Sequence, residues 1–205
     1  MEKFLLILCL ATAINNFAQN IKIADSEHIY VFTRSTTHKK GFIAEDFNIK
    51  DSLSTHVGIG FFENGKFNVY NVDNVKKSLN QSSLIREDYS SFINLNNIYH
   101  SAIWSYRTNK LKINTLKDAL NQYEKQIILF DKDFRLDNEA TKLYCSEFVF
   151  LILGEIGIST NFKPVKKELT SFYKSFFKRS TIEYIPVDFF TELDGFVMLE
   201  QKFYK

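Results

Sequence analysis

The dipeptide Asn64-Gly65, which lies between two runs of apolar and β-branched residues, constrains the fold of this chain more than any other short segment. A type I′ turn needs positive φ at both central positions, and Asn and Gly tolerate that conformation best. The pattern therefore predicts a β-hairpin whose strands are residues 55–62 and 67–72. A two-residue turn also fixes the register of the hairpin, with Glu63 opposite Lys66.

The predicted register brings four informative positions onto one face of the hairpin. Counting back from the turn, Gly58 lies opposite Asn71 and His56 lies opposite Asp73. A carboxylate directly across from His56, and an amide diagonally across, can fix the tautomer and orientation of the imidazole. Gly58 leaves room beside the histidine for a facing helix or a substrate. The alternative is a strand histidine that is hydrogen-bonded and has no chemical role.

Three further strands are predicted from runs of β-branched and aromatic residues, at 29–32, 102–106 and 196–199. The segment 36–51 is polar and mixed, and we expect a loop with a short strand there. Strands and helices are segregated along the chain rather than strictly alternating. The predicted fold class is therefore α+β, with an antiparallel sheet packed against helices.

Apolar residues recur at helical spacing in three segments. The first helix is expected to begin with Asn114 or Thr115 as its cap. The second is expected to begin at or beside Cys145 and to end at Gly154 or Gly157. The third is expected to have one apolar face. The apolar positions that mark the first and third helices are Leu116, Ala119, Leu120, Tyr123 and Ile127, and Leu169, Phe172, Tyr173, Phe176 and Phe177.

The N-terminus has the pattern of a secretory signal peptide. Lys3 is followed by a short apolar run that includes Cys9, and Ala18 supplies a small residue at a plausible cleavage point. The run is too short to span a bilayer, so residues 1–18 are predicted to be removed and residues 19–205 to form one domain. We therefore expect an exported protein, in the periplasm, at the cell surface or in the medium, without a transmembrane span after cleavage.

The composition argues against several classes of function. The net charge of +2 gives no broad electrostatic footprint for nucleic acid. No metal or other cofactor is predicted, because the remaining histidines lack metal-ligand spacing and the acidic loop at 131–137 lacks the glycine and closing glutamate of an EF-hand. These remaining histidines are His28, His38 and His100. No oligomeric state is predicted.

Cys145 would be the only cysteine after cleavage of the signal peptide. Exported proteins usually carry cysteines in disulfide pairs, so a single thiol is a candidate reactive group. The first N–H groups of a helix carry partial positive charge, which favours a thiolate and lowers the thiol pKa from its ordinary value of about 8.5. Glu147 in the same turn suits the helix dipole and is interpreted as structural. The alternative is a buried, inert cysteine.

Together these motifs carry a resemblance. A His56-Val57-Gly58-Ile59 strand, a hairpin with a polar residue on its returning strand, and a later Tyr144-Cys145-Ser146-Glu147 entering a helix resemble the circularly permuted, YiiX-like branch of the NlpC-type papain-like cysteine hydrolases. In that branch the histidine strand precedes the cysteine helix. The resemblance extends over roughly residues 29–199, including the segments 116–123, 130–134 and 185–188.

The chain departs from the pattern of this branch in two places. Ser26-Glu27-His28 stands where a Gly-Asp turn is common, and Val69-Tyr70 is followed by Asn71 where glutamate is common. Asparagine serves as the third polar residue in papain-type triads. The resemblance therefore implies the catalytic set Cys145, His56 and Asn71, whereas the register count favours Asp73 as the third residue.

The resemblance implies acyl transfer through a thioester on Cys145, with His56 as base and the Cys145 N–H as a donor to the oxyanion. The expected substrate is a peptide or other compound with an amide bond, plausibly derived from the cell wall. A lipid acyltransferase or esterase of the lecithin:retinol acyltransferase type is one alternative, which an apolar groove around Cys145 would favour. A non-catalytic binding module on the same fold is another, which an inert, buried Cys145 would favour.

A basic stretch interleaved with Phe and Tyr follows the predicted cysteine helix. It can be the solvated face of an amphipathic helix, or a surface for anionic wall polymers or lipid headgroups. Its basic residues are Lys163, Lys166, Lys167, Lys174, Lys178 and Arg179.

Overall fold

A computed structural model describes residues 24–37, 41–74, 81–94, 96–136, 141–158 and 161–204. The predicted signal peptide, Cys9 and His38 lie outside the described residues. No helix in the described part of the chain is long and apolar enough to cross a membrane.

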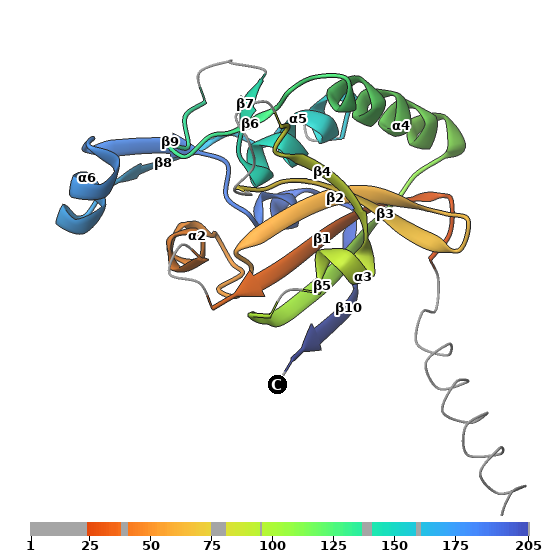
Figure 1. Cartoon of the computed structure of the whole chain (residues 1–205), viewed down its shortest axis with the longest axis horizontal. Coiled ribbons are helices and arrows are strands. Elements are labelled where there is room, and N and C mark those ends of the chain that lie inside the picture. The colour runs from red at the N-terminus through yellow and green to blue at the C-terminus, as the bar shows by residue number, and fades with distance from the viewer. Residues whose placement is uncertain are drawn as a thin grey trace, which may run out of the picture.

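Within the described residues, one six-stranded antiparallel sheet forms the centre of the fold, in the order β10-β5-β1-β2-β3-β4 (Figure 1). Two short strand pairs accompany it: β6 with β7, which are parallel, and β8 with β9, which are antiparallel. The strands of the large sheet are β1 (His28–Thr36), β2 (His56–Glu63), β3 (Lys66–Val72), β4 (Leu84–Asp88), β5 (Ile98–Arg107) and β10 (Phe196–Phe203). The shorter strands are β6 (Leu129–Phe130), β7 (Lys142–Leu143), β8 (Val165–Glu168) and β9 (Thr181–Tyr184).

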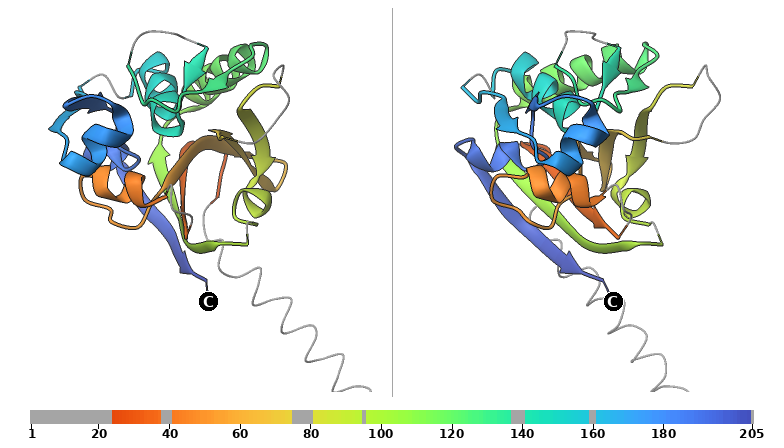
Figure 2. Two further views of the ribbon diagram at one scale, coloured as in Figure 1. Left: turned by 60° about the vertical axis from the view of Figure 1, so that its left-hand side comes forward. Right: turned by 90° about the vertical axis from the view of Figure 1, so that its left-hand side faces the viewer.

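The helices lie around this sheet, and the α+β class is confirmed. They are α2 (Gly41–Phe47), α3 (Tyr89–Phe92), α4 (Lys110–Glu124), α5 (Cys145–Glu155) and α6 (Ser171–Phe177), with a 3-10 turn at Phe189–Glu192. Helices α4 and α5 cover one face of the curved sheet, and α3 lies at the other face (Figures 1 and 2). The larger core lies between the sheet and α4 and α5, and a smaller aromatic cluster that includes Phe92 of α3 lies on the opposite face.

The hairpin between β2 and β3 has the predicted turn and register. Asn64 and Gly65 both have positive φ, at 53° and 78°, as a type I′ turn requires. Glu63 pairs with Lys66, and the same register continues to Ile59 opposite Tyr70. The side chains that the sequence placed on one face therefore project together.

The structure corrects two of the predicted elements, the segment 36–51 and the first helix. Residues 36–51 contain helix α2 rather than a short strand. Helix α4 begins earlier than predicted, because Asn109 caps it by accepting a hydrogen bond from the Lys112 N–H. Its first turn also contains the buried Ile113, three residues before Leu116, so the apolar periodicity extends further than the predicted cap at Asn114 or Thr115 allowed. The predicted last position, Ile127, lies beyond the helix and is exposed.

A buried carboxylate joins two distant segments of the fold. Asp188 is fully buried, and its oxygens accept hydrogen bonds from the backbone N–H groups of Ile49, Lys50 and Asp51 at 2.6 to 3.0 Å. The loop after α2 is thereby tied to the segment that follows β9. This segment also contacts the start of α5, so the loop and the helix are positioned through one anchor.

Substitution Asp188→Asn is expected to lower the free energy of unfolding by about 2–4 kcal/mol. The amide keeps one acceptor oxygen but turns donor hydrogens toward backbone N–H groups that have lost their acceptor. Chemical denaturation measures the change. The exposed Asp194 offers a matched control, and Asp194→Asn should change stability little. Equal stability of the two variants would contradict the anchoring role of Asp188.

Candidate active site

Helix α5 begins at Cys145, as predicted, because the residue before it leaves the helix. Tyr144 has extended backbone angles, φ −106° and ψ 167°, and the Glu147 carboxylate accepts a hydrogen bond from its N–H at 3.5 Å. The Ser146 hydroxyl donates to the carbonyl of Ile185 at 2.7 Å, and the Tyr144 hydroxyl accepts from the Ile185 N–H at 2.8 Å. The first turn of the helix is thus fixed on both sides.

His56 lies at the start of β2 and is held by the side chain of Asn71. The distance from His56 Nε2 to Asn71 Oδ1 is 2.9 Å. An amide oxygen only accepts hydrogen bonds, so Nε2 carries the proton and Nδ1 of the neutral ring is free to accept one. Of the two third residues that the sequence left open, Asn71 is the one that holds His56 in this structure.

The orientation of Asn71 is itself determined by a neighbouring strand. Its Nδ2 donates to Glu87 Oε1 on β4 at 2.9 Å, which requires Oδ1 to face His56. Burial raises the pKa of Glu87. The chain of contacts runs from His56 through Asn71 to Glu87, a residue that the sequence analysis did not select. Strand β4 was not predicted, so no signal placed Glu87 beside the hairpin.

Asp73 is paired with a buried cation, Arg34. Arg34 Nη2 donates to Asp73 Oδ2 at 2.7 Å, and Nη1 donates to the Phe92 carbonyl at 2.6 Å. The guanidinium carbon lies 4.4 Å from the centre of the Phe92 ring, and the His56 ring stacks on the same ring at 5.9 Å. The sequence patterns did not identify Arg34 or Phe92 as candidate site residues. A charged residue within a buried strand was the available signal for Arg34, since such a charge is costly without a partner.

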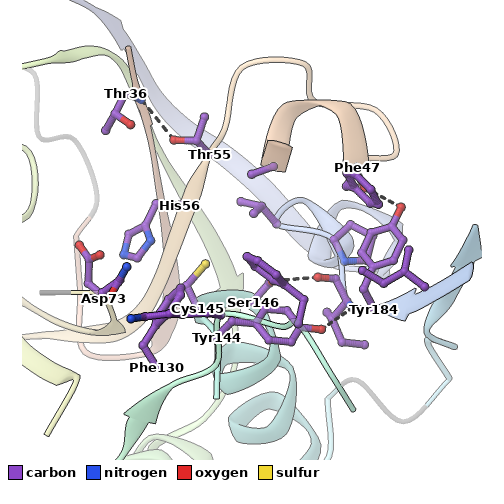
Figure 3. A pocket seen from close by; sticks show the side chains of 18 of the residues that line it. Thr36, Phe47, Thr55, His56, Asp73, Phe130, Tyr144, Cys145, Ser146 and Tyr184 are labelled. Carbon is purple, nitrogen blue, oxygen red and sulfur yellow. Dashed lines mark hydrogen bonds between the residues drawn. The ribbon is translucent and has the colours of Figure 1, made fainter. Parts of the chain in front are cut away.

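His56 and Cys145 line the same cavity of about 450 Å³ (Figure 3). The Cys145 sulfur and the His56 ring point toward the same space, with Asp73 beside the histidine. The walls away from them are mainly aromatic and aliphatic and include Phe47, Phe134, Phe177, Ile182 and Tyr184. The cavity therefore combines a polar part, which the thiol and the imidazole both line, with an apolar part.

Burial dominates the electrostatics of the two reactive groups. It lowers the pKa of His56 to about 4, assisted by the charge of Arg34 and opposed by Asp73 and Asn71. It raises the pKa of Cys145 to about 11, although backbone hydrogen bonds from Val57 and Ser146 and the charge of Arg34 act in the opposite direction. The predicted lowering of the thiol pKa is thus outweighed, and the pair is a neutral thiol and a neutral imidazole at neutral pH.

The other described histidines lie away from this cavity. His28 contacts Asp25 at 2.6 Å, and the buried His100 lies between the side chains of Ser35 and Gln201. Across the described part of the chain, no three His, Cys, Asp or Glu side chains converge in a way that could hold a metal ion.

No protein-family model matches the chain, and no curated protein matches it. Among solved structures, the chain is similar to the metalloprotein yiiX from Escherichia coli O157:H7, with a TM-score of 0.60 and 10% sequence identity. The similarity covers 85% of this chain and 97% of that chain. The fold is therefore YiiX-like, as the resemblance of the two motifs predicted. Among the residues that the structure describes, no set of donors fits a metal ion, so no chemical step is assigned to one.

The buried thiol should react slowly with iodoacetamide at neutral pH, and the rate should keep rising above pH 9, because the pKa of Cys145 is about 11. Rates measured by mass spectrometry from pH 5 to pH 11 test this. A rate that already reaches a plateau below pH 7 would show a stable thiolate–imidazolium pair and contradict the neutral state.

The free energy of unfolding should fall as pH is lowered from 6.5 to 4. In this window His56 is protonated in the unfolded state but stays neutral in the folded state. With an unfolded pKa of about 6.5 and a folded pKa of about 4, the loss is on the order of 3 kcal/mol. His56→Gln should remove this contribution and flatten the dependence in that window. Urea denaturation at several pH values measures it, and parallel curves for both proteins would refute the assignment.

Proposed function

We propose that this protein is a thiol hydrolase that cleaves a carbonyl bond through a thioester on Cys145. The observation that carries this function is the fixed His56, bonded to Asn71 at 2.9 Å, at a cavity that it shares with Cys145. A nucleophile, a base and a residue that orients the base are the parts that such chemistry requires. The YiiX-like fold agrees with this class of site.

In this mechanism His56 Nδ1 takes the proton of the Cys145 thiol as the sulfur attacks the carbonyl carbon. The low pKa of His56 keeps Nδ1 free, and Asn71 holds the ring as it becomes charged. The Cys145 N–H at the start of α5 is the candidate donor to the oxyanion. The imidazolium then protonates the leaving amine or alcohol, and a water molecule, deprotonated by His56, resolves the thioester and restores the thiol.

The lining of the cavity bears on the choice of substrate. Most of its other lining side chains are aromatic or aliphatic, and Lys132, Thr36 and Thr55 are also among the lining residues. An apolar wall favours an apolar acyl group over a charged wall peptide, because polar groups lose hydration without gaining partners there. We therefore favour an ester or amide with an apolar acyl group. The amide bond of a cell-wall peptide stays the second candidate, and export through residues 1–18 would give access to either.

Cys145→Ala should abolish hydrolysis of 4-nitrophenyl acyl esters, and His56→Ala should lower kcat/KM by about 10²–10⁴-fold. Asn71→Ala should cost less than His56→Ala, because the base remains but its orientation is lost. Stopped-flow release of nitrophenol, with the acyl-enzyme trapped by acid and weighed, tests the scheme. Activity retained in Cys145→Ala would exclude it.

The dependence of kcat/KM on the length of the acyl chain distinguishes the two candidate substrates. If the cavity takes an apolar acyl group, kcat/KM should rise from acetyl to octanoyl esters, while a disaccharide–tetrapeptide wall fragment is not cleaved. The reverse order would favour the peptide substrate. A thiol that is neither acylated nor alkylated in the folded protein would indicate a binding module.

A further inference from the structure

Strands β8 and β9 and helix α6 form a small arm, residues 163–184, that projects at the end of the molecule opposite α4 (Figure 1). Its inner side is anchored in a separate apolar cluster. Tyr173 and Phe177 pack edge to face against Phe47 of α2, and Leu169 and Ile182 are buried beside them. The Tyr173 hydroxyl also donates to the Asp46 carboxylate. These contacts fix the position of the arm relative to α2.

Contrary to the sequence prediction, the apolar residues of α6 do not all lie on one face. Phe172 and Phe176 lie one helical turn apart and are 68% and 53% exposed, while Tyr173 and Phe177 point inward. Two exposed phenylalanines on a seven-residue helix leave an apolar ridge in contact with solvent. Single exposed apolar residues are common, but a paired ridge on a projecting element is typical of an interaction surface.

The charge of the arm is distinct from that of the rest of the chain. Residues 163–184 contain six basic and two acidic residues, a net charge of +4, whereas the whole chain has +2, so the remainder carries −2. Lys174 and Lys178 alternate with the exposed phenylalanines along the chain, and Lys174 lies about half a turn around the helix from Phe172 and Phe176. Lys163 and Lys166 are further exposed basic residues of the arm. The acidic residues are Glu183, which pairs across the strands with Lys166, and Glu168 at the far end of β8.

The ridge is continuous with the apolar part of the cavity. Phe176 and Phe177 line the cavity that contains Cys145 and His56, and Phe176 is also part of the exposed ridge. Apolar side chains that penetrate a headgroup region, flanked by lysines, are the features by which peripheral proteins bind anionic bilayers. An anionic polymer without an apolar phase would leave Phe172 without a partner.

We infer that the arm docks on an anionic lipid bilayer, with Phe172 and Phe176 in the interface and the lysines at the headgroups. Docking in this position sets the apolar end of the cavity against the membrane, so that an acyl chain can pass to Cys145 without crossing water. This role rests on the proposed function only for the identity of the substrate, since membrane binding itself needs no turnover.

Vesicle binding tests the inference with the mature protein. Cosedimentation is measured with phosphatidylglycerol–phosphatidylcholine vesicles and with pure phosphatidylcholine vesicles. Phe172→Ser, and separately Lys174→Gln with Lys178→Gln, should each lower the partition coefficient for anionic vesicles by about tenfold. The matched controls are Leu111→Ser on α4, which removes a side chain that is 74% exposed, and Lys110→Gln at the start of α4 with Lys125→Gln at its C-cap. The controls should bind as the unmodified protein does.

The inference would be overturned if the control substitutions lowered the partition coefficient as much as those in the arm, or if Phe172→Ser left it unchanged. So would binding to a soluble anionic polymer such as polyglutamate without binding to vesicles. Hydrolysis of soluble 4-nitrophenyl butyrate separates the two failures, because neither Phe172 nor the lysines line the cavity. Full esterase activity without vesicle binding refutes docking alone, whereas vesicle binding with no esterase activity refutes the proposed function and leaves docking intact.

Discussion

The packing of α5 against β2 is the contact on which the candidate site depends. Phe148, Val149 and Ile152 of the helix share one core with Val57 and Ile59 of the strand. Because that interface is fully buried, the helix has one position, and the Cys145 sulfur is held at the backbone of Val57, next to His56. The reactive pair is a consequence of apolar packing, with each member supplied by a different element.

Around this contact the protein buries more charge than stability alone explains. The Arg34–Asp73 ion pair, the Asn71–Glu87 bond and the His56 ring converge on Phe92 and β3. Burial opposes the charged form of Arg34 and of Asp73, although the charges of His56 and Arg34 lower the pKa of Asp73 overall. Replacing such groups by apolar residues is often neutral or stabilising, so their clustering at a cavity supports the proposed site.

The neutral state of the thiol and imidazole agrees with the character of the cavity. The low polarity of the cavity accounts for both properties. The aromatic walls that would accommodate an acyl chain also disfavour a thiolate–imidazolium ion pair. In the proposed mechanism, proton transfer from sulfur to nitrogen then accompanies attack on the carbonyl. The continuation of these walls into the exposed ridge of α6 gives the site an apolar route to the surface.

The sequence by itself determined the hairpin, its register, the start of α5 and the α+β class, because a turn dipeptide, alternating side chains and helical periodicity act over a few residues. The resemblance favoured Asn71 as the partner of His56, with Asp73 as the alternate from the register count. The sequence patterns did not identify Arg34, Glu87 or Phe92, and the helix start predicted a lowered pKa for Cys145. Tertiary structure decided these points, since they depend on neighbours distant in the chain: β4 orients Asn71, β1 brings the cation that pairs with Asp73, and burial by both layers outweighs the local effect of the helix start.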